Sequence, residues 1–370
     1  MKVALIHDHL AQDGGAERVL KVLAGMFPDA PIYTLLYEKK NADKYYKGRH
    51  IETSIIQRLP GGIKHYQWYM PFMPMAVEFF DLNSYNLVIS DTSSFAKGVI
   101  TSTHTLHLCY CHTPTRYLWS DTHQYINELK YNKYFKKIIS LVLNYIRMWD
   151  RLAADRVDCY MANSRFVAGR IKKYYKREAT VIYPPVEIEK FSLADKVDDY
   201  FLIGGRLSPY KRVDLAIEAF KKTNKSLKIF GDGIDLSRLK NLARGHKNIE
   251  FLGRVDDEAK AGLYSRALAF INPQEEDFGI TAVESMASGR PVIAYRSGGA
   301  LETIIEGVTG VFFDKQTVDS LARALMNFDS AKFNPEAIRR HVEQFSVDRF
   351  KKEIEEFINR EYENFKSHSA

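Results

Sequence analysis

The feature that most constrains the fold of this chain is a stretch in which two buried strands alternate with two helix starts. The apolar run at 267–272, ALAFIN, has the length and composition of a buried strand of a parallel sheet. An acidic turn containing glycine follows, and then a helical pattern over 280–288 that a glycine and a proline end. A second strand at 291–295 leads through Ser-Gly-Gly into another helix start. Strand ends and helix N-termini thus meet at one edge, where open α/β sheets bind phosphorylated ligands.

Two carboxylates frame this stretch. Glu276 lies in the turn and Glu284 lies on the helix, with seven residues between them. This spacing is too long for the two side chains to share a proton as neighbours on one helical face. We therefore expect them to hold different parts of a polyhydroxylated ligand, one from the loop and one from the helix.

The segment around the two carboxylates, P-x-x-E-D-F-G-I-x-x-x-E-x-M-A-x-G-x-P-V, resembles the E-x7-E motif of the retaining glycosyltransferases of family 4, which have the GT-B fold. Two glutamates at this spacing are common by chance, but the surrounding pattern is specific. The resemblance implies that Glu276 binds the donor sugar ring and that Glu284 holds the nucleotide ribose. It also implies that the backbone amides of Phe278, Gly279 and Ile280 contact sugar hydroxyls.

Length and composition fit a soluble protein of two ordinary domains. The chain has 370 residues, of which 45% are hydrophobic and 27% charged. The formal charge of +7 suggests an anionic ligand or surface, without choosing among nucleotide, phospholipid and nucleic acid. Because no nucleic-acid recognition motif accompanies the charge, we expect no nucleic-acid partner.

Cysteine usage and hydropathy indicate the compartment. The chain has three cysteines and no C-x-x-C, which suggests a reducing environment without a disulfide framework. The N-terminal apolar run is short and broken by His-Asp-His, unlike a signal peptide, and no apolar run approaches ~18 residues. We expect a cytoplasmic protein, with the inner face of the cell membrane left open as its site.

The N-terminal segment predicts a strand at 1–6, a Gly14-Gly15 turn and an amphipathic helix. Glycine lets the backbone approach an anion, and a helix start offers free N–H groups. The segment is not a G-x-G-x-x-G fingerprint, and a simple tight turn is the alternative. In family 4 this turn packs against the donor diphosphate, and Gly15 matches that position.

The runs at 90–100 and 106–119 resemble mannosyltransferases of bacterial and archaeal polysaccharide assembly within family 4. His112 ends a strand and precedes Thr-Pro, which forces the chain out of the sheet. The resemblance implies that His112 reaches the donor sugar.

The histidines and cysteines near His112 also raise the question of zinc. On a strand at 106–111, His107, Cys109 and Cys111 would share one face and His112 would lie on the other. Zinc ligands usually come as cysteine pairs on turns, so we expect no metal site here.

Two segments of the first half are rich in apolar side chains. The segment at 59–80 is either an exposed patch that meets lipid or acceptor, or loop core, and we favour loop core. The segment at 125–151 has a basic start and a wide apolar pattern, which suits a helix on anionic lipid and equally a core helix with a solvated first turn. Lipid contact would fit an acceptor glycan carried on a polyprenyl chain.

The second domain begins after a stiff Pro-Pro linker at 181–186. We predict an α/β chain of the GT-B class, with two Rossmann-like, doubly wound parallel-sheet domains that face a cleft. The predicted domains are 1–183 on the acceptor side and 184–350 for the nucleotide sugar. In GT-B enzymes the C-terminal helix packs back on the first domain, and we expect the helix at 351–370 to do the same.

Two cations follow the first strand of the second domain. Arg206 and Lys211 match the family pattern G-R-x-x-x-x-K, which holds the donor diphosphate. Cleavage of a sugar–phosphate bond leaves negative charge on the diphosphate, and fixed cations can stabilise it. Because no D-x-D motif occurs at a strand end, we expect Arg206 and Lys211 to stabilise the diphosphate without a metal ion. By resemblance, backbone groups around Gly233, Arg254 and Val255 line the base pocket.

Together these features predict a retaining hexosyltransferase without metal or cofactor. Its donor is a nucleotide sugar, with GDP-mannose favoured, and its acceptor is a glycan or a polyprenyl-linked glycan. Arg206, Lys211, Glu276 and His112 are the expected catalytic residues, and the donor's own phosphate is expected to take the acceptor proton. The alternatives are a UDP-sugar transferase of glucose type, a UDP-GlcNAc 2-epimerase-like enzyme, a phosphorylase and a non-enzymatic nucleotide-sugar binder.

Overall fold

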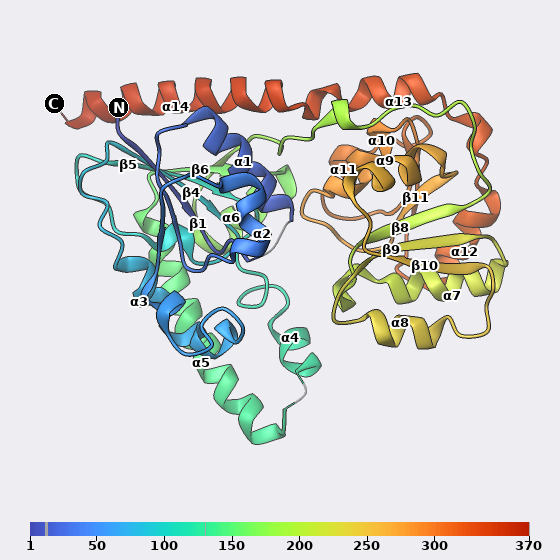
Figure 1. Cartoon of the computed structure of the whole chain (residues 1–370), viewed down its shortest axis with the longest axis horizontal. Coiled ribbons are helices and arrows are strands. Elements are labelled where there is room, and N and C mark those ends of the chain that lie inside the picture. Colours follow the sequence, from blue (N-terminus) through green and yellow to red (C-terminus); the bar gives the residue numbers. More distant parts are fainter. Residues whose placement is uncertain (12–13, 130, 370) are drawn as a thin grey trace. The chain divides into compact units, whose positions relative to one another are not determined.

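The computed structural model of the chain describes residues 1–11, 14–129 and 131–369. The chain divides into two compact units (Figure 1). Unit 1 joins Met1–Pro185 to the chain from Phe350 onward, and unit 2 is Val186–Arg349. The sequence predicts boundaries after residues 183 and 350. Each unit is an α/β structure built on one parallel sheet.

The described part of unit 1 contains a seven-stranded parallel sheet. In spatial order its strands are β3 (Ile51–Thr53), β2 (Ile32–Thr34), β1 (Val3–His7), β4 (Leu87–Thr92), β5 (Leu106–Cys111), β6 (Cys159–Ala162) and β7 (Ala179–Val181). Leu5 of β1 pairs with Ile32 on one side and with Ile89 on the other. The chain order reverses between β1 and β4, which makes the carboxyl ends of these two strands the topological switch point.

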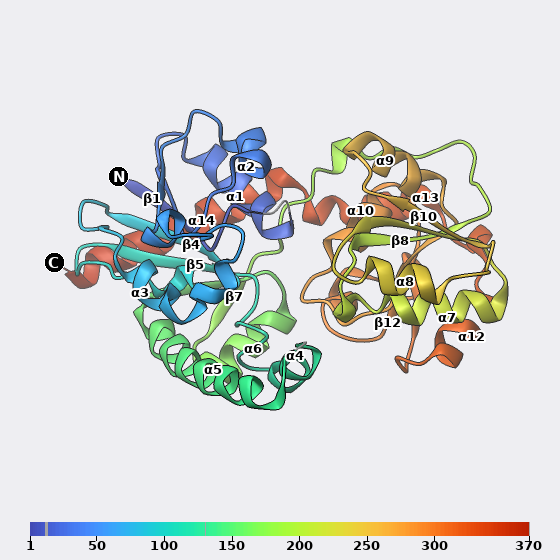
Figure 2. The same ribbon diagram turned by 60° about the horizontal axis from the view of Figure 1, so that its bottom comes forward.

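Helices cover both faces of this sheet because alternate strand residues point to opposite sides. Leu5 faces a core shared with α1 and α2, whereas Ala4 and Ile6 face a core shared with α3 and α5. Figure 2 shows α3 and α5 on one side of β4 and β5. The helices of unit 1 are α1 (Gly15–Met26), α2 (Lys39–Tyr46), α3 (Met73–Glu78), α4 (Thr122–Glu128), α5 (Lys133–Ala153), α6 (Arg165–Tyr175) and α14 (Val347–Ser369).

The C-terminal helix α14 contributes to the core of unit 1. Phe350, Ile354, Phe357 and Ile358 are buried at a helical spacing, in the same cluster as Leu5. The rings of Phe350 and Tyr110 of β5 pack edge-to-face, with 5.7 Å between centroids. The last helix in sequence is therefore part of the first unit in space.

Unit 2 contains a six-stranded parallel sheet in the described chain. In spatial order its strands are β10 (Ile249–Gly253), β9 (Leu227–Asp232), β8 (Phe201–Arg206), β11 (Ala269–Asn272), β12 (Val292–Tyr295) and β13 (Gly310–Phe313). Its helices are α7 (Val213–Thr223), α8 (Leu236–Leu242), α9 (Asp257–Arg266), α10 (Ile280–Ala287), α11 (Ala300–Thr303), α12 (Val318–Asn327) and α13 (Pro335–His341). The order reverses between β8 and β11, so the switch point of unit 2 lies there.

Two details of the secondary structure differ from the sequence prediction. The short edge strands β3 and β7 were not predicted, because three residues are too few to show a strand period. The apolar segment at 125–151 forms two helices, and Asn132 begins the second by accepting from the amides of Tyr134 and Phe135. In the described chain, every helix is too short or too polar to cross a bilayer.

Candidate active site

The switch point of unit 2 brings together the two loops that carry its predicted catalytic residues. Strand β8 ends at Arg206 and continues into η6 (Pro209–Lys211), a short 3-10 helix. Strand β11 ends at Asn272 and continues into the loop that holds Glu276. Because β8 and β11 are paired in the sheet, their carboxyl ends are neighbours.

Lys211 and Glu276 are in direct contact across this point. The Lys211 ammonium donates to Oε1 of Glu276, and Gln274 Nε2 donates to the same oxygen at 2.6 Å. Burial lowers the pKa of Lys211, but the charge of Glu276 and its hydrogen bond outweigh this effect and raise the pKa above its usual value. The positive charge of Arg206 also lowers the pKa of Lys211, so the second cation is close enough to act on the first.

Two glycines fix the backbone of Glu276. The amide of Gly299 donates to the Glu276 carbonyl at 2.8 Å. A Cβ on Gly298 would collide with that same carbonyl oxygen, and Gly298 has a φ of +64°. The Ser-Gly-Gly turn after β12 therefore packs on the Glu276 loop as only glycine allows.

Helix α10 begins directly behind Glu276. Gly279 occupies its N-cap position with a φ of +93°, and Phe278 is buried with its ring edge-to-face against Phe345. Ile280 is half-buried as the first residue of the helix. Gly279 has no side chain to accept from the first amides of α10, so the helix presents its positive end beside Glu276.

Glu284, on the first turns of α10, is buried and held by α9. Lys260 Nζ lies 3.2 Å from its Oε1, and the Tyr264 hydroxyl donates to its Oε2 at 3.2 Å. A buried carboxylate with two fixed partners has little rotamer freedom, so its position relative to Glu276 is set before any ligand arrives.

The residues predicted around the base pocket follow β9 and β10. A Cβ on Gly233 would collide with the carbonyl oxygen of Leu207, so this glycine allows close packing of the loops after β8 and β9. Arg254 Nε lies 3.2 Å from Asp232 but the arginine is 83% exposed, so we expect the pair to contribute little stability. Val255 is half-buried.

The switch point of unit 1 carries a carboxylate between two imidazoles. Asp91 of β4 accepts from His7 Nδ1 at 2.9 Å and from His112 Nε2 at 2.6 Å. Asp91 and His7 are buried, and His112 is slightly exposed. The sequence prediction named His112 and missed its two partners. The available signal was the polar residues of His-Asp-His, which begins at the last residue of β1, and of Ser-Asp-Thr at the end of β4.

Titration of His7 gives the first prediction. Burial lowers the pKa of His7, but its hydrogen bond to Asp91 and the nearby carboxylates raise it to about 9. A raised pKa stabilises the fold below pH 6.5, and this contribution is lost as the pH rises to about 9. We expect the free energy of unfolding to fall by about 3 kcal/mol over this range. Urea unfolding at several pH values measures it. The His7→Gln variant should lose this slope, and an unchanged slope would contradict the assignment.

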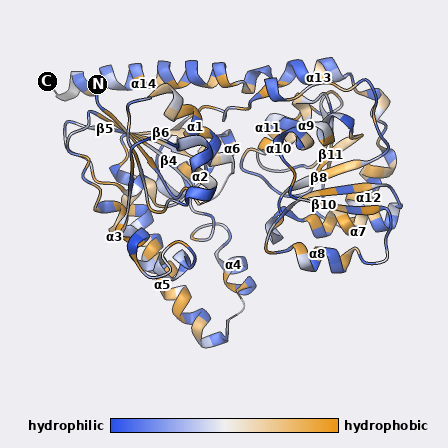
Figure 3. Cartoon of the chain, viewed as in Figure 1, coloured by the Kyte–Doolittle hydropathy of each residue, from blue (hydrophilic) through white to orange (hydrophobic). Residues whose placement is uncertain are grey.

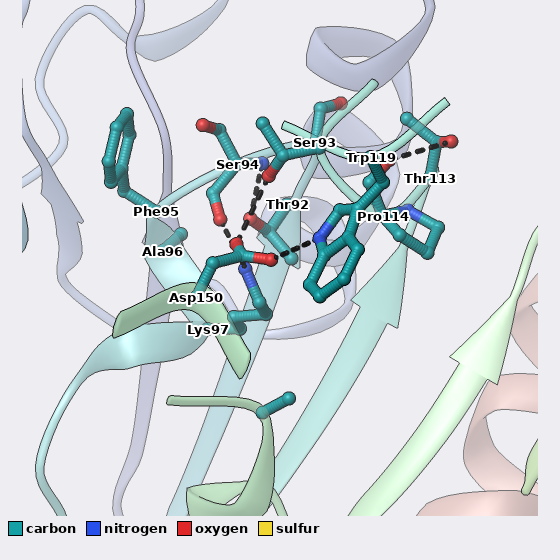
Figure 4. Close-up of polar contacts among 12 residues, drawn as sticks. Thr92, Ser93, Ser94, Phe95, Ala96, Lys97, Thr113, Pro114, Trp119 and Asp150 are labelled. Atoms are coloured by element: carbon teal, nitrogen blue, oxygen red, sulfur yellow. Dashed lines mark hydrogen bonds and ion pairs between the residues drawn. The ribbon is translucent and has the colours of Figure 1, made fainter. Parts of the chain in front are cut away.

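The loop after β4 is fixed by two buried carboxylates. Asp8, which follows β1, accepts from the amides of Ser93, Phe95 and Ala96 at 2.6–2.7 Å. Figure 4 shows Asp150 of α5 beside Lys97 and the indole of Trp119. Its Oδ1 lies 2.5 Å from Lys97 Nζ, and its Oδ2 accepts from Trp119 Nε1 at 2.8 Å. These bonds tie α5 to the carboxyl end of β4.

Gly15 is the first residue of α1 and follows the N-cap residue Gly14, which comes directly after the undescribed residues 12–13. The preceding amide, that of Gly14, donates to the Glu17 carboxylate at 2.9 Å. One of the N–H groups predicted to be available for an anion is therefore already used by the helix itself.

The candidate zinc cluster is part of the sheet. Cys109 and Cys111 are buried in the core that α6 covers, and His107 Nε2 lies 2.9 Å from Ser90 Oγ. Within 1–11, 14–129 and 131–369, no three His, Cys, Asp or Glu side chains are placed to hold a metal ion.

Two doubly wound parallel sheets in one chain, each with polar residues at its switch point, are the architecture of the GT-B fold class. Solved structures have the same fold. The Anabaena protein HepE in complex with UDP aligns with a TM-score of 0.70 at 17% identity, over 97% of this chain and 100% of that chain. A sucrose-phosphate synthase from Thermosynechococcus elongatus aligns with a TM-score of 0.75 at 16% identity, over 98% and 100%.

Two family models match adjoining parts of the sequence. "Glycosyltransferase Family 4" matches residues 13–190, and "Glycosyl transferases group 1" matches residues 186–344. The chain belongs to glycosyltransferase family 4 and is a glycosyltransferase. This membership favours glycosyl transfer over the epimerase, phosphorylase and non-enzymatic alternatives.

Curated relatives include characterised and uncharacterised members. The alpha-1,3/1,6-mannosyltransferase ALG2 of Dictyostelium discoideum is 24% identical over 416 residues, which cover 95% of this chain and 94% of the relative. An uncharacterized glycosyltransferase of Methanocaldococcus jannaschii is 30% identical over 184 residues, which cover 49% of this chain and about half, 52%, of the relative.

Proposed function

We propose that this glycosyltransferase is a retaining, metal-independent mannosyltransferase that uses GDP-mannose. The observation that carries the proposal is the Lys211–Glu276 contact at the switch point of unit 2, with Arg206 beside it. Mannose is favoured because ALG2, named as a mannosyltransferase, is similar over nearly the whole chain. UDP-sugar transfer is the second candidate, since solved structures of the same fold contain UDP and UDP-glucose.

In this proposal the donor lies across the end of the unit 2 sheet. An ammonium group has three donors, so Lys211 can contact a phosphate while it still holds Glu276. Glu276 then accepts from sugar hydroxyls, and the amides at the start of α10 (Phe278, Gly279 and Ile280) contact the same sugar. Glu284 accepts from the ribose, and the backbone at Gly233, Arg254 and Val255 borders the base.

The chemical step needs charge stabilisation on the leaving group. As the sugar–phosphate bond breaks, negative charge grows on the diphosphate, and the positive charges of Arg206 and Lys211 stabilise it. The donor's phosphate oxygen takes the proton of the incoming hydroxyl, which attacks from the face that the diphosphate leaves. His112, oriented by Asp91, and Gly15 are the residues of unit 1 that the proposal assigns to the donor.

The acceptor in this proposal is a glycan, free or carried on a polyprenyl lipid. The reaction then takes place in the cytoplasm, at the inner face of the cell membrane. The basic first turn of α5 supports a site beside anionic lipid.

A donor screen tests the proposal. A ligand that binds only the folded state raises the Tm, so GDP and GDP-mannose should stabilise the protein more than UDP and UDP-glucose do. GDP-mannose should also be consumed faster than UDP-glucose when a polyprenyl-linked acceptor is supplied, with retention at the sugar carbon. Stabilisation and turnover by UDP-sugars alone would make the second candidate correct.

A further inference from the structure

Helix α5 presents one continuous apolar stripe to the outside of unit 1. Its members recur at steps of three and four residues, so they share one face over roughly 27 Å of helix. Each is between 53% and 71% exposed. Figure 3 shows hydrophobic positions along the projecting part of the helix. The α5 stripe consists of Tyr134, Ile138, Leu141, Tyr145, Met148 and Leu152.

A second apolar bank lies on η2 (Tyr66–Phe72) and α3. Met73 and Val77 are buried, but Trp68, Phe72 and Phe79 are each more than half exposed. The interpretation of 59–80 as loop core was therefore wrong for these three side chains. Exposed aromatic residues gathered in this way mark an interaction site.

An apolar groove separates the two banks. Its volume is about 360 Å³, and its walls come from η2 on one side and from α4 and α5 on the other. It adjoins a second cavity of about 360 Å³, with which it shares Gln67, Met70 and Tyr125. That second cavity reaches Asp8 and Arg116 at the carboxyl ends of the unit 1 strands. The two cavities thus lie side by side between the stripe and the switch point.

The charges around the stripe indicate what covers it. Helix α5 carries five basic residues, at 133, 136, 137, 147 and 151, and its one acidic residue, Asp150, is buried against Lys97. The heptad-like spacing of the stripe would also fit a second copy of the helix. Two copies would bring basic flanks together with no acidic side chain on the helix to pair them, whereas an anionic lipid surface matches the charge.

We propose that the α5 stripe and the η2 bank dock on an anionic lipid bilayer, and that the groove between them takes one hydrocarbon chain of a lipid. Tyrosine and tryptophan side chains prefer the membrane–water interface, and the stripe and groove supply Tyr134, Tyr145 and Trp68 there. A helix that lies in the plane of the interface buries such a stripe and leaves its lysines at the head groups. The docking does not depend on the sugar donor.

Vesicle sedimentation of the full chain tests the docking. Phosphatidylcholine vesicles that contain phosphatidylglycerol should bind the protein, and added salt should weaken the binding. Leu141→Asp should lower the affinity for vesicles at least about tenfold, because burial of a charged aspartate among the hydrocarbon chains of the lipid is unfavourable. The matched control is Ile234→Asp, since Ile234 is 90% exposed in unit 2, and it should bind as the wild type does. Replacing Lys133, Lys136 and Lys137 with glutamine should cost about fivefold for each lysine.

Three outcomes would overturn the docking proposal. One is equal vesicle binding by Leu141→Asp and the wild type, and another is equal binding to neutral and anionic vesicles. The third is that the wild type does not bind vesicles but sediments as a dimer, and that Leu141→Asp converts this dimer to a monomer. The stripe would then be an interface between copies of the chain. If the donor screen failed but the protein still bound anionic vesicles, the proposed function would be wrong and the docking proposal would still hold.

Quenching tests the groove. Lipids with brominated acyl chains should quench Trp68, which lines the groove, so the wild type should lose more fluorescence than Trp68→Tyr on the same vesicles. Equal quenching of both proteins would show that no chain enters the groove.

Discussion

Replacement of Lys211 by alanine is expected to lower kcat by about 10²–10³-fold, equivalent to about 3–4 kcal/mol of lost transition-state stabilisation. The ammonium is largely buried at the switch point and lies against Glu276, so water cannot replace it well. Gln274 still donates to the Glu276 carboxylate in the variant, which limits the effect on folding. Steady-state kinetics with saturating donor and a circular dichroism melt separate the two effects.

A second lysine on the neighbouring helix provides the control for this variant. Lys222 of α7 is exposed and pairs with Asp319 at the surface, so Lys222→Ala should change the activation free energy by less than about 0.5 kcal/mol. If Lys211→Ala retained the wild-type kcat and only raised KM, the cation would bind ground state and transition state equally. That outcome would remove Lys211 from the catalytic step.

Replacement of Asp150 by alanine is expected to lower the free energy of unfolding by about 3–5 kcal/mol. Lys97 and Asp150 are each 1% exposed, and removal of the carboxylate leaves the Lys97 charge buried without its counter-ion. The same change removes the acceptors of Trp119 Nε1 and Thr115 Oγ1. Urea unfolding at neutral pH measures the loss.

Two further variants make this prediction specific. Asp155, five residues beyond Asp150, pairs with Arg151 while 54% exposed, so Asp155→Ala should cost at most about 0.5 kcal/mol. The double variant Lys97→Met with Asp150→Leu should be more stable than Asp150→Ala, because it removes both charges together. Equal losses for Asp150→Ala and Asp155→Ala would show that the buried pair does not hold α5 to the sheet.

Much of the fold was predictable because parallel strands buried on both faces appear as uninterrupted apolar runs. The runs at β1, β11 and β12 gave strands within a residue or two of those observed, and the glycine turns after them were visible as well. The contact between Lys211 and Glu276 could be anticipated because each residue lies in a dense local motif, one after β8 and the other after β11.

The partners of His112 could not be found in this way. His7 and Asp91 are 84 positions apart and meet only because β1 pairs with β4, which local periodicity does not specify. The same limit applies to α5. Its sequence shows an apolar pattern, but only packing shows that Leu143 and Ile146 face the core while Leu141 faces outward.

If Arg206 and Lys211 hold the diphosphate of the donor, the protein should bind GDP much more tightly than guanosine. Calorimetric titration of the protein with each of these two ligands tests this most directly. Charge-assisted hydrogen bonds contribute about 1.5–3 kcal/mol each, so the wild type should bind GDP more than roughly a hundredfold more tightly than guanosine. In the Arg206→Ala, Lys211→Ala double variant this preference should nearly vanish, while guanosine binds as before. A preference for GDP that persists in the double variant would contradict the claim.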